Sequence, residues 1–172
     1  DNGAKVINMS LGGSAPSRTL EDAVNYAWGK GAVLVAAAGN SGNCSPTYPA
    51  YYKNCIAVAA TDSSDQKASF SNYGKWVDVA APGVDIFSTV PNHESRLFGA
   101  PSDPYWYGSG TSMATPHVAG VAALVWATTS YGTSNVSVRY QIEMTADKIA
   151  GTGTYWRYGR VNACRAVGGS CQ

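Results

Sequence analysis

The sequence is poor in charge and in histidine. Only 13% of its 172 residues are charged, and it contains 2 histidines. The net charge of +1 gives no electrostatic reason to expect a nucleic acid or an acidic membrane surface as a partner. The longest apolar run, residues 118–127, is too short to cross a bilayer and contains Gly120. Because 45% of the residues are apolar, we expect a compact globular protein.

An initiator methionine and a signal peptide are also missing. The chain opens on Asp1, Asn2 and Gly3, a turn that leads directly into a strand-like segment. We therefore expect an internal start, left by processing or cleavage of a longer polypeptide.

Cysteines are few, but they fall in two close pairs. Cys44 lies near Cys55 in the sequence, and Cys164 lies near Cys171. Two short disulfides of an exported protein fit this spacing, and free buried thiols are the alternative. Zinc is disfavoured, because there is no Cys-x-x-Cys pair and both histidines are far from the cysteines.

Apolar runs alternate with amphipathic segments, which predicts an α/β protein with a mostly parallel sheet. The continuous apolar run at residues 32–38 is typical of a parallel strand that is covered on both faces. The long stretch at residues 91–108 is expected to be an irregular surface loop. The further expected elements are strands at 6–10, 56–60 and 77–81, a helix capped by Thr19, a buried helix at 112–127, and a helix capped by Asn135 and carrying Val138, Ile142, Thr145 and Ile149 on one side.

Ser112 is a candidate nucleophile. It stands among small residues at the start of the apolar helix, where another backbone can approach closely. The free N–H groups and the positive end of the helix dipole would face a bound group there and stabilise an oxyanion. The alternative is an ordinary serine cap followed by a core helix.

Neither histidine is an evident base for this serine. His117 follows Ser112 by five residues on the same helix, which turns it about 140° away, so we expect it to hydrogen-bond the helix to a neighbouring segment. His93 lies in the irregular stretch, where surface exposure is expected. An α/β-hydrolase is disfavoured, because its histidine would have to follow Ser112, and the only histidine that does so, His117, is turned away. A dinucleotide-binding fold is disfavoured too, because no G-x-G-x-x-G is present.

The motifs of this chain resemble those of the subtilisin family of serine peptidases, and most closely its thermitase-like branch. The resemblance implies a subtilisin-like three-layer fold and runs through nearly the whole sequence. The matching segments, in family order, are residues 6–13 (VINMSLGG), 36–40 (AAAGN), 48–50 (YPA), 68–74 (ASFSNYG), 79–83 (VAAPG), 110–120 (GTSMATPHVAG), and 151–156 with 159–163.

This resemblance implies a role for several residues. Ser112 would attack a peptide carbonyl, and Asn40 would donate its side-chain amide to the oxyanion beside the Ser112 backbone N–H. Read alone, Asn40 follows an apolar strand, where α/β sheets bind ligands, although a plain Gly-Asn turn is the alternative. The implied substrate-binding residues are Ser10, Leu11 and Gly12, which would pair with an extended peptide, and Ala37, Ala38 and Gly39, which would wall a roomy apolar pocket.

The family's aspartate and histidine motifs are missing from the chain. No aspartate is followed by Ser-Gly or Thr-Gly, and no His-Gly occurs. We therefore expect residues 1–172 to be the C-terminal part of one subtilase catalytic domain, completed by an upstream segment that carries both residues. The family's tight calcium site would lie largely in that segment. The resemblance also implies a weaker cation site near Ala50, Tyr52 and Asp78.

Three functional hypotheses follow. The first is a secreted serine endopeptidase that acts on protein or peptide substrates without a catalytic cofactor and is inactive without its upstream segment. The second is a non-catalytic, peptide-binding or structural fragment. The third uses His93 as a substitute base and predicts cleavage by the isolated chain. Tyr105, Trp106 and Tyr107 would either shape the leaving-group side of the cleft or decorate the surface.

Overall fold

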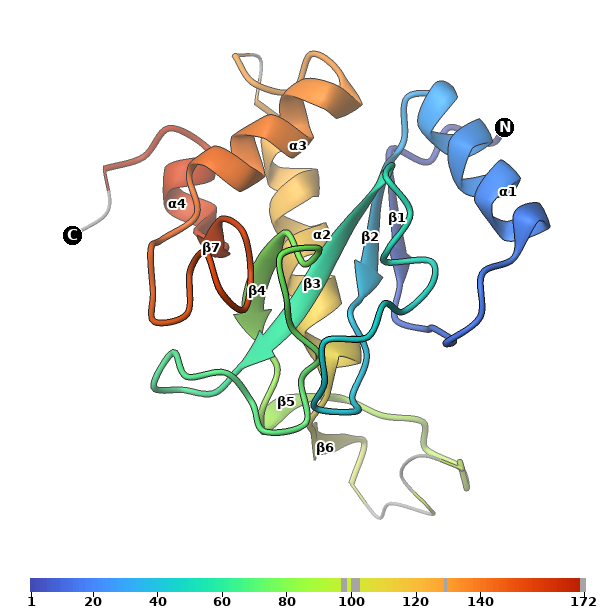
Figure 1. The fold of residues 1–172 in the computed structure, drawn as a ribbon, viewed down its shortest axis with the longest axis vertical. Helices are drawn as coiled ribbons and strands as arrows, with labels where there is room; N and C mark the ends of the chain where they lie inside the picture. The colour runs from blue at the N-terminus through green and yellow to red at the C-terminus, as the bar shows by residue number, and fades with distance from the viewer. Residues whose placement is uncertain (97–98, 100–102, 129, 171–172) are drawn as a thin grey trace.

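A computed structural model describes residues 1–96, 99, 103–128 and 130–170 of the chain (Figure 1). Its centre is a five-stranded, wholly parallel sheet in the order β1-β2-β3-β4-β7. The inner strands β2 and β3 are buried at every position, as the continuous apolar run at residues 32–38 predicted for β2. The strands of this sheet are β1 (Val6–Met9), β2 (Val33–Ala37), β3 (Cys55–Thr61), β4 (Val79–Pro82) and β7 (Gly159–Arg160).

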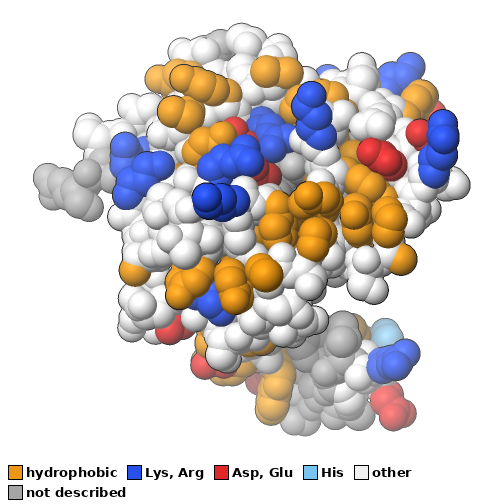
Figure 2. Space-filling model, in the orientation of Figure 1, with side chains coloured by type: hydrophobic (Ala, Val, Ile, Leu, Met, Phe, Trp, Pro, Cys, Tyr) orange, Lys and Arg blue, Asp and Glu red, His pale blue; other side chains and the backbone are white. Residues whose placement is uncertain are grey.

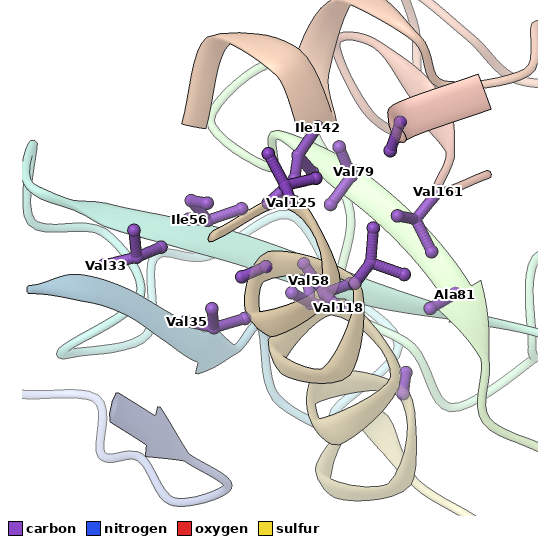
Figure 3. Packing of buried hydrophobic residues seen from close by; sticks show 14 of the residues in the cluster. Val33, Val35, Ile56, Val58, Val79, Ala81, Val118, Val125, Ile142 and Val161 are labelled. Carbon is purple, nitrogen blue, oxygen red and sulfur yellow. The ribbon is translucent and has the colours of Figure 1, made fainter. Parts of the chain in front are cut away.

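Two helices cover opposite faces of the sheet, which gives the predicted three layers. Along β2, Val33 and Val35 face the cluster that contains α2 (Thr111–Trp126). Leu34, between them, faces the cluster that contains α1 (Arg18–Gly29). Alternate strand residues therefore point to opposite layers, as a pleated strand requires. Figure 3 shows Val118 and Val125 of α2 among valines and Ile56 from the strands, with Ile142 of α3 (Asn135–Met144) nearby.

Both predicted helix caps were wrong by one or two residues. Ser17, rather than Thr19, caps α1, and its hydroxyl accepts a hydrogen bond from Leu20 N at 3.4 Å. Ser134, rather than Asn135, caps α3 (Asn135–Met144) through a capping box with Ser137. Each helix start has more than one side chain that can cap it, so that sequence alone does not select one.

The ends of α3 follow from longer-range contacts. The Asn135 amide nitrogen donates to the carbonyls of Trp28 and Ala32 at 2.8 and 3.3 Å, which ties α3 to the end of α1. At its other end α3 stops at Met144, so the predicted continuation to Ile149 is wrong. There, the backbone of Asp147 instead pairs with Arg160 in β7. A short helix, α4 (Ala163–Ala166), follows β7.

Part of the expected irregular loop is a β-hairpin. Strand β5 (Ile86–Thr89) pairs antiparallel with β6 (Tyr105–Gly108). Phe87 holds the two strands together, because its ring lies 5.6 Å from that of Tyr105 and 4.9 Å from that of Tyr107. In Figure 1 the hairpin projects below the carboxyl ends of the parallel strands, close to the start of α2.

The first predicted disulfide is not formed. Cys55 is buried at the start of β3, whereas Cys44 is exposed in the loop after β2, and both are free thiols. Cys55 packs as a small apolar side chain, and burial raises the pKa of its thiol to about 12. Cys171 lies outside the described residues, so the pairing of Cys164 with Cys171 stays a prediction. In the described part of the chain, no helix is long and apolar enough to cross a membrane.

The core makes a direct prediction about stability. Ile142 on α3 is fully buried in the main cluster, whereas Val136 on the same helix is 60% exposed. We expect Ile142→Ala to lower the free energy of unfolding by about 2–5 kcal/mol, because it removes buried methyl groups and leaves a cavity. Val136→Ala, the matched control, should change it by less than about 0.5 kcal/mol. Equal losses in chemical denaturation would contradict the packing described.

Candidate active site

Ser112 is half-buried in the first turn of α2 and is tied to the end of strand β1. The Ser10 hydroxyl donates to the Ser112 carbonyl at 2.7 Å, and the Ser112 hydroxyl donates to the Ser10 carbonyl at 3.3 Å. These reciprocal bonds join residues that are 102 positions apart in the sequence. The predicted nucleophile and the predicted substrate strand therefore lie side by side.

Asn40, the predicted oxyanion donor, is fixed by Thr111. Its side-chain oxygen accepts from the Thr111 backbone N–H at 2.9 Å and from the Thr111 hydroxyl at 2.8 Å. The Thr111 hydroxyl in turn accepts from Gly39 N at 3.1 Å. A backbone N–H can only donate, so the amide oxygen must face Thr111 and the amide nitrogen must point the other way. Thr111 was missed by the sequence analysis, although it directly precedes Ser112.

Two free donors converge beside Gly110. Among the described residues, neither the Asn40 side-chain nitrogen Nδ2 nor the Ser112 backbone N–H takes part in a hydrogen bond. A methyl group built on Gly110 would lie 3.4 Å from Asn40 Nδ2 and 3.6 Å from Ser112 N, so both donors border one small volume. A glycine keeps that volume open. Such a pair of preorganised donors can stabilise an anionic oxygen.

The start of α2 is held against the sheet by close backbone contact. Gly110 N donates to the Gly83 carbonyl, just past β4, at 2.7 Å. A methyl group on Gly83 would come within 2.6 Å of the Ala60 Cβ and 2.8 Å of the Gly110 carbonyl oxygen. A larger residue at position 83 would therefore push α2 off the sheet and move Ser112 away from Asn40.

The other predicted substrate residues line the same end of the sheet. Among the described residues, strand β1 pairs with β2 alone, and Leu11 just beyond it is 59% exposed. Gly12 and Gly39 both lie against the Thr47 side chain. A methyl group built on Gly12 would lie 2.6 Å from Thr47 Cγ2, and one built on Gly39 would lie 2.8 Å from Thr47 Oγ1. The segment predicted to pair with the substrate and the predicted pocket wall are thus neighbours. Ala37 and Ala38 are only 4% and 0% exposed, so these residues can offer a ligand little beyond their backbone.

Neither histidine contacts the Ser112 hydroxyl. His117 is exposed, and its Nδ1 bonds to the Met113 carbonyl of its own helix at 2.9 Å, so the expected bond to a neighbouring segment was wrong. His93 is exposed as expected, with its Nδ1 bonded to the Glu94 carbonyl at 3.0 Å. Among the described residues, no imidazole is placed to take a proton from Ser112.

A mostly apolar cavity of about 480 Å³ opens beside Ser112. Its walls come from β5, from β6 and from the first turns of α2, including Met113 and His117. Of the three aromatic residues expected either to shape the cleft or to decorate the surface, Trp106 lines this cavity, whereas Tyr105 and Tyr107 pack against Phe87. No Lys, Arg, Asp or Glu is among the lining residues in the described part of the chain.

The residues predicted to bind a cation, Ala50, Tyr52 and Asp78, line one cavity at the amino ends of β3 and β4, and the cation site stays a prediction. The described residues contain no group of three His, Cys, Asp or Glu that could hold a metal, but calcium also binds backbone carbonyl oxygens. Asp78 Oδ2 already accepts from Ala57 N at 2.9 Å and from Arg139 at 3.3 Å. The Tyr52 hydroxyl is bound to the Ser17 backbone, and its carbonyl accepts from Cys55 N. Arg139, 61 residues away in sequence, was not foreseen.

Comparison with known proteins agrees with this geometry. The model of the subtilase family matches residues 1–161. The chain belongs to the subtilase family. It is 59% identical over 167 residues to thermitase from Thermoactinomyces vulgaris, covering 97% of this chain and 55% of thermitase. It is 57% identical over 167 residues to a thermophilic serine proteinase from Bacillus sp. (strain AK1), covering 97% of this chain and 38% of that protein. These matches bear out the predicted thermitase-like branch.

More distant subtilases and a solved structure extend the comparison. Subtilisin BL from Lederbergia lenta is 47% identical over 163 residues, which are 95% of this chain and 56% of that protein. A protease from Pseudoalteromonas arctica PAMC 21717 superposes with a TM-score of 0.86 at 36% identity, over 98% of this chain and 52% of that one. The fold is therefore that of a subtilisin-like protease. The chain spans about half the length of thermitase and of subtilisin BL.

Asp78 predicts an unusual dependence of this subtilase on pH. Burial outweighs the attraction of Arg139 and raises the pKa of the Asp78 carboxyl from 3.8 to about 6. Between these values the folded protein holds a proton that the unfolded chain releases. The contribution of Asp78 to stability should therefore fall as pH rises from about 4 to about 6, by at most about 3 kcal/mol.

Thermal unfolding across this pH range tests the prediction. Asp78→Asn should flatten that part of the profile, even though it weakens the bond to Arg139. Asp22→Asn, which changes an exposed aspartate on α1, should leave the profile unchanged. A profile for Asp78→Asn that parallels the parent protein would contradict the assignment.

Proposed function

We propose that this chain supplies the nucleophile and the oxyanion hole of a secreted serine endopeptidase. The Ser112 hydroxyl attacks the carbonyl carbon of a peptide bond, and the carbonyl oxygen becomes negatively charged. Asn40 Nδ2 and Ser112 N–H donate to that oxygen. The observation that supports this most strongly is the convergence of these two free donors next to the serine hydroxyl.

The general base comes from outside this chain. A serine hydroxyl needs a neighbouring base that is itself oriented by a third group. His93 and His117 bond to backbone carbonyls of nearby residues and not to Ser112. The histidine and aspartate of the triad would therefore reside in an upstream segment of the same catalytic domain. The mechanism uses no cofactor.

Substrate binding uses the edge of the sheet. An extended peptide would add to the backbone at Ser10, Leu11 and Gly12, beyond the free edge of β1. The Ser10 hydroxyl already holds the Ser112 carbonyl, so the bound strand would be aligned with the nucleophile. The apolar cavity next to Ser112 would then receive a side chain on the leaving-group side, with Trp106 as one wall.

A fluorophosphonate probe tests the assignment of Ser112. We expect the intact protein to form a covalent adduct at Ser112, located by peptide mass spectrometry, and to lose peptidase activity in proportion. Ser112→Ala should abolish labelling, while Ser109→Ala, which alters a nearby serine bonded to Asp85, should retain it. Absence of labelling in an assembly that contains the upstream segment would refute a catalytic role.

A second prediction separates the donor from the residue that holds it. Asn40→Ala should lower kcat with little change in KM, since the donor acts on the transition state. The loss of this type of donor in subtilisin, from which the magnitude is taken, lowers turnover by about a hundred- to a thousandfold.

Thr111→Val keeps the shape of Thr111 and the backbone N–H that bonds to Asn40, but removes both bonds of the hydroxyl, the one to Asn40 and the one from Gly39 N. It should lower kcat by about tenfold, because the side chain of Asn40 is held less firmly. Steady-state kinetics on a peptide substrate measures both variants. Equal kcat values for the parent protein and Asn40→Ala would contradict the proposed oxyanion hole.

The missing base supports one alternative of a different class, a peptide-binding protein without turnover. The free edge of β1 would then recruit an extended chain, and Ser112 would serve only to brace Ser10. Binding of a peptide without cleavage or labelling, in the presence of the upstream segment, would favour this alternative.

A further inference from the structure

Residues 39–43, here called the oxyanion loop, carry the proposed donor Asn40 but have no core of their own. They form no helix or strand, and Asn40, Ser41 and Asn43 are exposed. Neither the loop nor the segment beside it, residues 70–73, contains a charged residue. Figure 2 shows most Lys and Arg side chains of this face gathered toward α3, at the other end of the sheet. Hydrogen bonds between neutral groups, rather than ion pairs, therefore hold the loop.

The backbone of the oxyanion loop is bonded to residues 70–73 from its first position to its last. The three bonds run from Asn72 N to the Gly39 carbonyl at 2.9 Å, from Gly42 N to the Phe70 carbonyl at 2.7 Å, and from Tyr73 N to the Asn43 carbonyl at 3.1 Å. Residues 68–74 are one of the motifs in the family resemblance, and no role was assigned to them. Their contact with the loop gives them one.

The side chain of Asn72 adds three more bonds and is only 3% exposed. Its Oδ1 accepts from Ser41 N at 2.9 Å and from Asn43 N at 3.4 Å, and its Nδ2 donates to the Thr47 hydroxyl at 3.1 Å. A backbone N–H can only donate, so the amide oxygen must face the loop. One side chain thus bonds to the loop at two positions, and the first of them, Ser41, directly follows Asn40.

Asn72 is itself anchored to the sheet through its neighbour Ser71. Ser71 is fully buried, and its hydroxyl accepts from Ala60 N in β3 at 2.9 Å and donates to the Asn72 carbonyl at 3.0 Å. On the loop side, a methyl group built on Gly39 would come within 2.6 Å of Asn72 Nδ2. Only a glycine allows this close approach. Asn72 therefore transmits the fixed position of β3 to the loop that carries Asn40.

We propose that Asn72 is a positioning residue for the oxyanion hole, an inference that rests on the proposed function of Asn40 and Ser112. Thr111 holds the side-chain oxygen of Asn40, whereas Asn72 holds the backbone on both sides of Asn40, through Gly39 and Ser41. Without the Asn72 side chain, the loop would shift relative to Ser112. A displacement of about 1 Å is enough to lower a rate by about a hundredfold.

Steady-state kinetics on a peptide amide substrate, with the intact protein and its upstream segment, tests the proposal. Asn72→Ala should lower kcat by about ten- to a hundredfold and change KM by less than about threefold, because the positioned donor acts on the transition state. In the Asn40→Ala background the same substitution should lower kcat by less than about twofold, since the donor that Asn72 positions is already absent. If Asn72→Ala does not fold, Asn72→Leu, which has a similar shape, takes its place in the same comparison.

Asn135→Ala is the matched control. Asn135 is also a buried asparagine whose amide nitrogen bonds to two backbone carbonyls, but it lies at the amino end of β2, away from Ser112. This substitution should lower the melting temperature, as Asn72→Ala does, without lowering kcat. An equal loss of kcat in Asn135→Ala would show that lost stability alone explains the effect, and would overturn the proposal.

The kinetics also separate this inference from the proposed function. An unchanged kcat in Asn72→Ala, or equal losses in the parent and Asn40→Ala backgrounds, would overturn the positioning role and leave the oxyanion hole intact. An unchanged kcat in Asn40→Ala would instead refute the oxyanion hole, and the role of Asn72 with it.

Discussion

The hydrogen bonds between Asn40 and Thr111 are the interaction on which the candidate site depends. It connects the end of β2 to the first residue of α2, two elements separated by 71 positions in sequence. Three bonds meet at the buried Thr111: its N–H and hydroxyl go to Asn40, and its hydroxyl accepts from Gly39. If these bonds were lost, Ser112 and Asn40 would both remain in the molecule, but their donors would no longer face one volume.

Small residues allow the start of α2 to come close enough to the sheet for these hydrogen bonds to form. The helix α2 lies on the sheet through alanines and glycines near its start, and Gly83 leaves no room for a side chain between Ala60 and Gly110. Further along, α2 uses valines, such as Val118 and Val125, to fill the main core (Figure 3). Close backbone contact at one end and large buried side chains at the other fix both the position and the direction of α2. The candidate site is therefore as rigid as the packed core that holds this helix.

The sequence predicted what depends on short-range patterns. Apolar runs located the strands that became β2 and β3, and the uniformly apolar segment became α2. Motif resemblance also singled out Ser112 and Asn40, which the structure brings close together. The caps failed because Ser17 and Thr19 are equally good candidates locally. The pairing of Cys44 with Cys55 failed because nearness in sequence does not show that one thiol is buried at a strand start while the other is exposed.

Contacts between distant segments could not be predicted from the sequence for the same reason. Nothing near Asp78 in the sequence indicates that Arg139, on a helix near the end of the chain, will form an ion pair with its carboxylate. The motif resemblance implies a cation site there, and the folded chain adds a guanidinium that the sequence did not indicate. Thr111 lies next to Ser112 in the sequence, but its role in holding Asn40 follows only from the contact between the end of β2 and the start of α2.

The two ends of the sheet treat negative charge in different ways. Beside Ser112 the donors are neutral N–H groups, and the adjoining cavity has no charged residue among those described. Neutral dipoles stabilise a charge that exists only briefly, without holding a permanent anion that would block the site. At the opposite end, the charged side chains of Asp78 and Arg139 line a cavity away from any reacting group.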